Sequence, residues 1–254
     1  MQRQAVIMLT KLSVEDSVAV LTLNNPGKMN ALSSDLIREI GEKISNIEQK
    51  ANVLIITGEG RAFAAGVNVA EIDRHSCESA LKEDFIDYQW ESVARVKIPT
   101  IAAVSGYALG GGFELALMCD IIVATENSKF GFPEVNLGIM PGMGGTQMLT
   151  RIVGSKLASR IIMTGNFLSA TEAKELGIVS EVVSNDGLIS GVTELARSIA
   201  EKPALSLRLI KEAINLAQNV GLTQGMRSER LMFRSLFSTR DKNEKVKEFL
   251  KSSA

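Results

Sequence analysis

Three short apolar runs, each rich in β-branched residues, constrain the fold of this chain more than any other feature. They are NVLIITG at 52–58, TIAAVSG at 100–106 and DIIVAT at 120–125. Short, continuous apolar runs that end at a turn are typical of strands buried in a sheet. Helical patterns separate the three runs, and strands that alternate with helices predict an α/β fold.

Other patterns place further elements around these strands. A β-hairpin is expected from residues 5–12 and 18–24, and Ser33 or Ser34 is expected to cap a helix that runs to about Lys50. The polar segment 70–84 lacks strong apolar periodicity, which predicts a loop or a loose helix. One short strand is expected at 178–183. One helix is expected near 85–96, one that begins at the glycines 110–112, and a separate one that ends at 152. Further helices are expected at 155–163, as a short helix after 169, and at 187–201, 203–219, 223–237 and 241–251.

Charge and composition exclude several classes of partner. The chain has 28 basic and 29 acidic residues, a net charge of −1, which gives no reason to expect nucleic acid or an anionic membrane as a partner. No apolar run approaches the ~18 residues that a membrane span needs. The start, MQRQAVIMLTKL, lacks the features of a secretory signal. Cys77 and Cys119 form no CxxC pair, so a cytoplasmic location without metal site or disulfide is expected.

The single histidine, His75, limits the catalytic chemistry that is available. A Ser-His-Asp site, a Cys-His site or a histidine-rich metal centre would have to use it. It lies in a polar stretch two residues before Cys77, where an exposed loop histidine is the simpler interpretation and a thiol site is the alternative. The chain contains neither GxxxxGK[ST] nor GxGxxG, so ATP and nicotinamide chemistry are not expected.

A carboxylate, Glu114, stands inside the stretch GYALGGGFELALMCD at 106–120, whose other residues are suited to burial. Burying a carboxylate without partners costs several kcal/mol or forces it to take up a proton. Glycines at the start of a helix leave N–H donors free, which is the chemistry of an oxyanion site. A structural salt bridge, or a first-turn glutamate that interacts with its own helix dipole, explains the pattern equally well.

A second carboxylate, Glu134, lies between Pro133 and Val135 in another stretch rich in apolar residues and glycine. Two such carboxylates could divide the roles of acid and base and so add or remove water without a metal or a histidine. The alternative is a structural ion pair, with Arg151 as the candidate partner. Spacing along the sequence does not show whether the two glutamates meet.

Four stretches together closely resemble the enoyl-CoA hydratase (crotonase) family, and the likeness spans nearly the whole chain. They are FAAGVN at 63–68, AAVSGYALGGGFELALMCDIIVA at 102–124, FGFPEVNLGIMPGMGGTQ at 130–147 and LTRIVGSKLAS at 149–159. The resemblance implies an α/β spiral of repeated ββα units over 1–200 and a helical oligomerisation region over 201–254. It also implies a homotrimer or homohexamer, an acyl-CoA substrate, and no metal or cofactor beyond the coenzyme A of that substrate.

The resemblance also assigns residues by position. Glu114 and Glu134 match the two catalytic glutamates of the family, and the backbone N–H groups of Val67 and Gly111 match the pair that holds the thioester oxygen. Trp90 aligns with an aromatic position, for which core packing is expected. The positions expected to bind the CoA thioester are Lys28, Ala64, Gly66, Val67, Asn68, Val69, Gly111 and Gly142.

Three residues depart from the pattern that is usual in the family. Val67 and Asn68 stand where the loop commonly ends in Ala-Asp, and the branched side chain of Val67 is expected to narrow the acyl pocket. Phe132 replaces a common Gln, which makes the surroundings of Glu134 more apolar.

The presence of both glutamates favours hydration over a simple double-bond shift. The resemblance therefore predicts a 2-enoyl-CoA hydratase of fatty acid β-oxidation or related acyl-CoA catabolism. Glu134 is expected to deliver the proton to the α-carbon, and Glu114 is expected to activate water. The alternatives are an enoyl-CoA isomerase, a hydratase-lyase acting on an aromatic acyl-CoA, and a catalytically silent CoA-binding scaffold.

Overall fold

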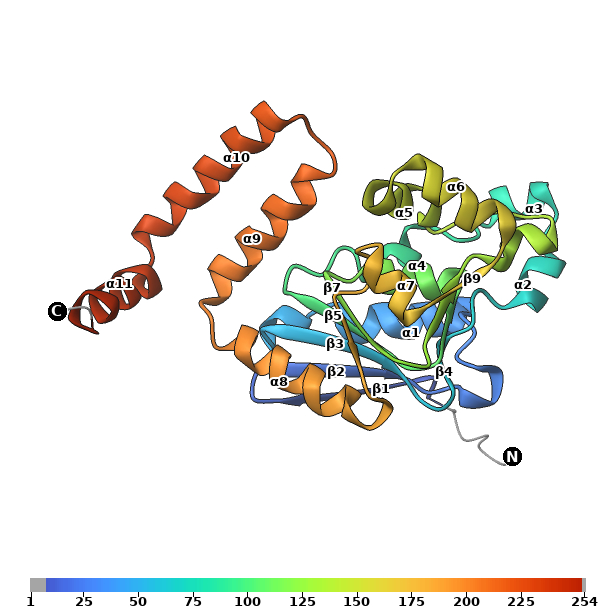
Figure 1. Ribbon diagram of the computed structural model, residues 1–254, viewed down its shortest axis with the longest axis horizontal. Helices are drawn as coiled ribbons and strands as arrows, with labels where there is room; N and C mark the ends of the chain where they lie inside the picture. Colours follow the sequence, from blue (N-terminus) through green and yellow to red (C-terminus); the bar gives the residue numbers. More distant parts are fainter. Residues whose placement is uncertain (1–7, 253–254) are drawn as a thin grey trace.

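Two sheets form the body of the protein, which the computed structural model describes over residues 8–252 (Figure 1). The larger sheet has the order β1-β2-β3-β5-β7-β10, and the smaller has the order β4-β6-β8-β9. Among the strands of residues 8–252, β1 with β2 and β8 with β9 pair antiparallel, and the other pairs are parallel. The strands are β1 Thr10–Glu15, β2 Val18–Leu23, β3 Val53–Gly58, β4 Ala62–Ala64, β5 Thr100–Val104, β6 Tyr107–Leu109, β7 Ile121–Thr125, β8 Lys129–Gly131, β9 Phe167–Ser169 and β10 Glu181–Val183.

Helices and short 3-10 turns connect these strands and continue beyond them. The 3-10 turns are η1 Pro26–Lys28, η2 Ile47–Gln49, η3 Tyr88–Glu91, η4 Pro133–Leu137, η5 Asn185–Gly187 and η6 Leu236–Ser238. The helices are α1 Ser34–Ile44, α2 Val69–Arg74, α3 Cys77–Lys82, α4 Gly111–Leu117, α5 Gly145–Val153, α6 Ser155–Thr164, α7 Ala170–Glu175, α8 Leu188–Ala200, α9 Ala204–Ala217, α10 Leu222–Ser235 and α11 Arg240–Ser252.

Three consecutive segments repeat the same path through the two sheets. In β3–β4, β5–β6 and β7–β8 the first strand lies in the larger sheet and the second in the smaller one, and helices follow each pair. Neighbouring repeats pair in parallel in both sheets, so the chain advances by one strand per turn. The predicted spiral of ββα units is therefore confirmed.

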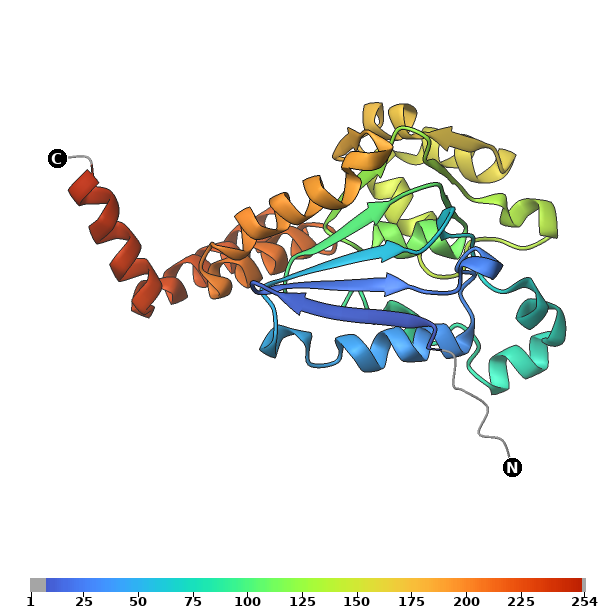
Figure 2. The same ribbon diagram turned by 90° about the horizontal axis from the view of Figure 1, so that it is seen from below.

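The central strands of the larger sheet, β3, β5 and β7, are buried on both faces, which explains why they are continuously apolar. Leu54 and Ile56 of β3 point into the main core, while Val53 and Ile55 pack on the other face in a second cluster. Helix α8 covers that second face with Leu188, Val192 and Ala196 (Figure 2). Alternate side chains of one strand thus enter two different apolar clusters.

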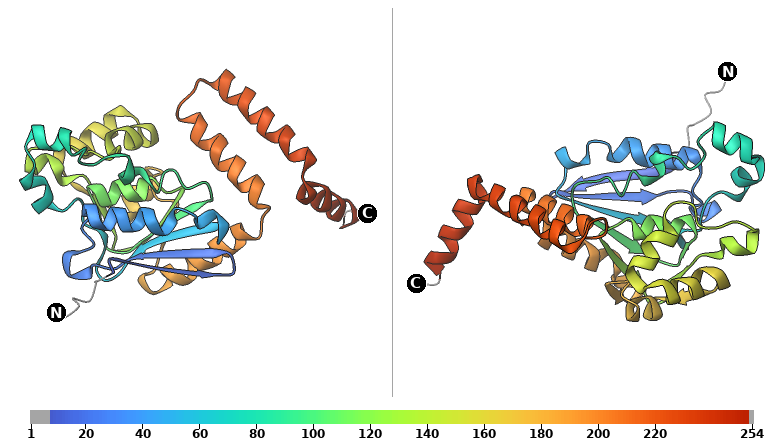
Figure 3. Two further views of the ribbon diagram at one scale, coloured as in Figure 1. Left: turned by 180° about the vertical axis from the view of Figure 1, so that it is seen from behind. Right: turned by 90° about the horizontal axis from the view of Figure 1, so that it is seen from above.

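Helices α9, α10 and α11 reach away from the sheets, as two opposite views show (Figures 1 and 3). Their bounds agree with the helices expected at 203–219, 223–237 and 241–251. Many large apolar side chains on them are exposed, namely Leu205, Ile210, Ile214, Leu222, Met226, Leu231, Phe233, Phe237, Val246, Phe249 and Leu250. Within residues 8–252 no helix is long and apolar enough to cross a bilayer.

One buried ion pair ties α9 to the body of the protein. The Nζ atom of Lys211, a residue only 7% exposed, lies 2.8 Å from Oδ2 of Asp120. It also donates to the carbonyl of Ile98 at 3.0 Å. Asp120 directly precedes β7 and Ile98 lies two residues before β5, so one ammonium group joins α9 to two segments of the spiral.

Some expectations about local structure are wrong. Instead of a helix near 85–96 there is only the short turn η3, because Asp84 and Ile86 adopt positive φ angles of 51° and 61° that no helix accommodates. The first helix ends at Ile44 rather than near Lys50. The polar segment 70–84, expected to be a loop or a loose helix, forms most of two short helices, α2 and α3, which agrees with the second alternative. The expected hairpin forms from Thr10 onward, and its residues 5–7 lie outside the described part.

Candidate active site

Glu114 lies in the first turn of α4 and is only 1% exposed. Its Oε1 atom accepts hydrogen bonds from the backbone N–H groups of Met143 at 2.8 Å and Gly145 at 2.7 Å. Within residues 8–252 it forms no ion pair with a basic side chain. The salt-bridge interpretation of Glu114 is therefore wrong, since backbone donors at the start of α5 hold the carboxylate.

Glycines allow this close approach of backbone to carboxylate. A Cβ atom on Gly145 would lie 2.9 Å from Glu114 Oε1 and 2.6 Å from the ring of Phe132. A Cβ atom on Gly112 would lie 2.0 Å from the carbonyl oxygen of Ala64, so α4 packs directly against β4. Separations this short exclude any side chain at both positions.

Glu134 lies in η4 and brings a second carboxylate to the same place. Its Oε2 atom is buried and has no hydrogen-bond partner among the described residues. Its Oε1 atom lies 2.6 Å from where a Cβ on Gly110 would be, directly before α4. Arg151 instead donates to the carbonyls of Gln147 and Gln218, so the proposed ion pair of Glu134 with Arg151 is wrong.

Burial raises the pKa of both carboxyl groups. The pKa of Glu134 rises to about 7, mainly through burial and partly through the charge of Glu114. Burial also raises the pKa of Glu114, against the opposing effect of the N–H groups of Gly145, Met143 and Gly142. The charges of the two groups interact, and the pKa of Glu134 suits a proton donor near neutral pH.

The raised pKa of Glu134 predicts a pH-dependent stability. Because its pKa is about 7 in the folded protein against 4.5 ordinarily, the folded state holds a proton that the unfolded chain has lost between these values. Ionised Glu134 therefore destabilises the fold increasingly as pH rises through that window. Glu134→Gln should leave Tm close to wild type near pH 4.5 and raise it at pH 8, as measured by differential scanning fluorimetry.

An exposed glutamate supplies the control for this measurement. Glu126→Gln, in the turn after β7, should shift Tm equally little at both pH values. A Tm difference between Glu134→Gln and wild type that does not change with pH would contradict the raised pKa.

Two backbone N–H groups lie side by side next to the glutamates. Gly111 is the first residue of α4, so its N–H has no partner within the helix. Val67 N lies 3.4 Å from where a Cβ on Gly111 would be, and its N–H has no acceptor among the described residues. Gly66, with a φ of 99°, allows the contact, because its Cβ position lies 3.2 Å from the carbonyl of Leu109.

The other residues expected to bind the substrate lie in the segments that lead to and from these donors and in the turn of Lys28. Ala64 is buried in β4, Asn68 caps α2, and Val69 is 55% exposed. Gly142 is exposed and precedes the Met143 donor. Lys28 is exposed in η1, whose next residue accepts a hydrogen bond from the N–H of Ala65 at 3.0 Å. The turn with Lys28 is thus joined to the loop of Val67.

Residues assigned no catalytic chemistry have structural partners. Trp90 is only 4% exposed and packs edge-on against Phe85, as expected for a core residue. His75 stacks on the same Phe85 and approaches Ser79 and Glu83, while Cys77 is exposed. No group of three or more His, Cys, Asp or Glu side chains suited to a metal occurs in residues 8–252.

The sequence interpretation missed one buried residue that shapes the site. Asn30 has a φ of 53° and is fully buried. Its side-chain amide donates to the carbonyls of Glu59 and Ala62, and its oxygen accepts from the N–H of Asn25. It fixes the turn of Lys28 against the strand that leads to the Val67 loop. The signal was available, because asparagine is the residue that most readily adopts such a conformation after glycine.

Comparisons with known proteins agree with this arrangement. A probable mitochondrial enoyl-CoA hydratase of Dictyostelium discoideum is 43% identical over 92% of this chain and 84% of its own length. A probable enoyl-CoA hydratase of Mycobacterium bovis is 40% identical over 94% of both chains. The crystal structure of an enoyl-CoA hydratase from Bacillus anthracis superposes with a TM-score of 0.91 at 34% identity, covering 96% of this chain and 97% of the other.

A family model described as enoyl-CoA hydratase/isomerase matches residues 13–253, which includes every residue of the site described above. The match extends from the first strand to the last helix. The chain therefore belongs to the enoyl-CoA hydratase/isomerase family.

Proposed function

We propose that this protein is a 2-enoyl-CoA hydratase, which adds water across the 2,3 double bond of an acyl-CoA thioester. The observation that carries the proposal is the unpaired, buried Oε2 of Glu134 beside Glu114 and two backbone N–H donors. The enoyl-CoA hydratase names of the relatives support the same activity. The cytoplasmic location expected from the sequence stays a prediction.

The backbone donors and the carboxylates divide the reaction between them. The N–H groups of Val67 and Gly111 would receive the thioester oxygen and stabilise the negative charge that develops on it. Ionised Glu114 would accept a proton from water as the oxygen bonds to the β-carbon. Protonated Glu134 would give its proton to the α-carbon, so that one water is added and the pair retains one proton in total. Because the two groups interact, their apparent pKa values belong to the pair.

Turnover of defined thioesters tests the proposal. Short, medium and aromatic 2-enoyl-CoA thioesters should each be assayed by the loss of absorbance of the conjugated double bond, and the product should be analysed for added water. Formation of a 3-hydroxyacyl-CoA supports hydration. A shifted double bond without added water would indicate an isomerase, carbon–carbon cleavage a hydratase-lyase, and binding without conversion a silent scaffold.

Activity should survive exhaustive chelation, because the proposed chemistry uses only carboxylates and backbone donors. Protein dialysed against EDTA should keep its kcat within about twofold of the untreated sample, with no nucleotide added. Loss of turnover that a divalent metal restores would contradict the two-carboxylate mechanism.

We further propose that the protein assembles as a trimer or a hexamer through its C-terminal helices. Phe233 and Phe237 lie in edge-to-face contact and are both more than half exposed, in a row of apolar side chains on α10 and η6. Exposed apolar patches of this kind mark interaction surfaces. Light scattering at micromolar concentration should give three or six times the chain mass of 27.4 kDa. A monomer at that concentration would contradict the proposal that the apolar side chains of α10 and η6 bind a second copy of the chain.

A further inference from the structure

The donor at Val67 belongs to a loop that is bonded to the segment before α1. The N–H of Leu32 donates to the carbonyl of Gly66, and the N–H of Asn68 donates to the carbonyl of Leu32, both at 2.8 Å. Leu32 and Val67 thus form a parallel bridge. Since successive residues of an extended chain direct their polar groups to opposite sides, the N–H of Val67 points away from Leu32. The bridge therefore sets the direction of this donor.

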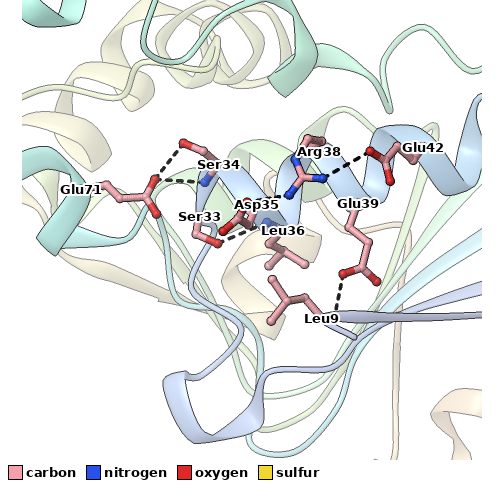
Figure 4. Close-up of polar contacts among 9 residues, drawn as sticks. All are labelled: Leu9, Ser33, Ser34, Asp35, Leu36, Arg38, Glu39, Glu42 and Glu71. Carbon is pink, nitrogen blue, oxygen red and sulfur yellow. Dashed lines mark hydrogen bonds and ion pairs between the residues drawn. The ribbon is translucent and has the colours of Figure 1, made fainter. Parts of the chain in front are cut away.

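The backbone bonds at Ala65, Gly66 and Asn68 hold the loop at and before Val67, and one side chain ties the segment after it to the start of α1. Glu71, in α2, accepts hydrogen bonds at Oε2 from the N–H of Ser34 at 3.0 Å and from its hydroxyl at 2.8 Å (Figure 4). Its Oε1 accepts from the side-chain amide of Asn68 at 3.3 Å. The oxygen of the same Asn68 amide, Oδ1, caps α2 by accepting from the N–H of Ala70 at 3.2 Å.

These contacts close a ring directly beside the Val67 donor. Leu32 and Ser34 stand two residues apart on one side, and Asn68 and Glu71 stand three apart on the other. The backbone bridge joins one end of each pair, and the Glu71 carboxylate joins the other. The start of α1 is itself held independently, because Ser33 caps it through the N–H of Leu36. The ring thus fastens the loop to a helix that packs in the main core.

Glu71 is suited to this role by charge as well as by reach. The start of α1 carries partial positive charge, and the N–H of Ser34 is one of the donors there that have no partner within the helix. The nearby Asp35 carboxylate is bonded to Arg38 at 2.7 Å, which leaves the Ser34 donors to Glu71 (Figure 4). Hydrogen bonds from neutral donors to a carboxylate are stronger than those between neutral groups.

We propose that Glu71 is a positioning residue, which holds the Val67 N–H in line with the Gly111 N–H through Ser34 and Asn68. The inference rests on the proposed function, because it assigns Val67 to the binding of the thioester oxygen. Glu71 itself would make no hydrogen bond to the substrate. Its removal would therefore change the direction of the Val67 N–H but leave that donor in place. A donor misplaced by a fraction of an ångström loses part of the 10²- to 10³-fold effect of a complete oxyanion donor.

The test compares Glu71→Ala with Asp73→Ala, which removes an exposed carboxylate from the same short helix. Glu71→Ala should lower kcat about 10-fold while changing KM less than about threefold. Asp73→Ala should leave both close to wild type. Glu71→Gln should recover part of kcat, because its amide oxygen can still accept from Ser34 while its NH2 group cannot accept from the Asn68 amide. Tm of all three variants should stay within a few degrees of wild type.

A second readout makes the result independent of turnover. The bound probe is a 4-dimethylaminocinnamoyl-CoA thioester, whose absorption moves to longer wavelength when its carbonyl is polarised. Wild type and Asp73→Ala should give the full shift, and Glu71→Ala a smaller one. A full shift and unchanged kcat in Glu71→Ala would overturn the inference. A loss of kcat that is fully explained by a lower Tm, with the probe shift unchanged, would overturn it as well. A wild-type protein that shifts the probe but hydrates no enoyl-CoA would overturn the hydratase proposal and leave the positioning role in place.

Discussion

Glu114→Gln should lower kcat for enoyl-CoA hydration by at least about 10²-fold and leave the protein folded. Glutamine keeps an oxygen that accepts from the N–H groups of Met143 and Gly145, so the link between α4 and α5 persists. It cannot accept a proton, and the loss of a positioned acid–base group costs about 10²- to 10⁴-fold. Burial raises the pKa of Glu114, so removal of its charge should leave Tm unchanged or slightly higher.

The double variant shows whether the two glutamates act as one unit. Glu134→Gln alone should reduce kcat by a similar factor, and Glu114→Gln/Glu134→Gln should be little worse than either single change. Glu126→Gln, on the exposed turn after β7, is the matched control and should keep full turnover. A Glu114→Gln protein that melts early yet turns over normally when folded would contradict the catalytic role.

Those parts of the fold that have a strong local signal could be predicted from the sequence. The runs at β3, β5 and β7 are apolar on both faces because each strand lies between two apolar clusters, and this pattern is visible in one dimension. The smaller sheet was missed because β4, β6, β8 and β9 have three residues each, too few to show a period of two. The bend at Asp84 and Ile86 was missed because a β-branched residue such as Ile86 rarely adopts a positive φ, so no sign of it was visible in the sequence there.

Some residues of the candidate site could likewise be predicted from the sequence, and others could not. Glu114 and Glu134 could be singled out because a carboxylate among apolar residues and glycines is unusual in any sequence. That they lie close enough to interact, with Met143 and Gly145 as donors to Glu114, depends on contacts between distant segments, such as those 29 to 31 residues apart. Glu71 gave no signal, because an acidic residue in a polar segment is ordinary until its partner Ser34 is known.

Lys211→Met should destabilise the protein by about 3 kcal/mol, the low end of the cost of breaking a buried ion pair. Methionine matches the length of the lysine stem but provides no donor for Asp120, for the carbonyl of Ile98 or for the hydroxyl of Thr100. The cost falls at the low end because Asp120 is 25% exposed and still accepts from the N–H and hydroxyl of Thr100 at 2.7 and 2.9 Å. For a chain of this size Tm should fall by about 6–12 °C.

The matched control is Lys202→Met, an exposed lysine in the turn between α8 and α9, which should change Tm by no more than about 2 °C. Lys211→Met/Asp120→Asn should recover part of the lost stability, because the aspartate charge that lost its partner is then removed as well. Equal melting of Lys211→Met and Lys202→Met would show that the ion pair contributes nothing. If the double variant melts below Lys211→Met, Asp120 contributes to stability through its contacts with Thr100 and not through Lys211. The expected order would show that Lys211 contributes most to the attachment of α9, beside the weaker bonds of Arg208 to Glu48 and of Arg151 to Gln218, so that the helices proposed for assembly depend on a residue buried against the spiral.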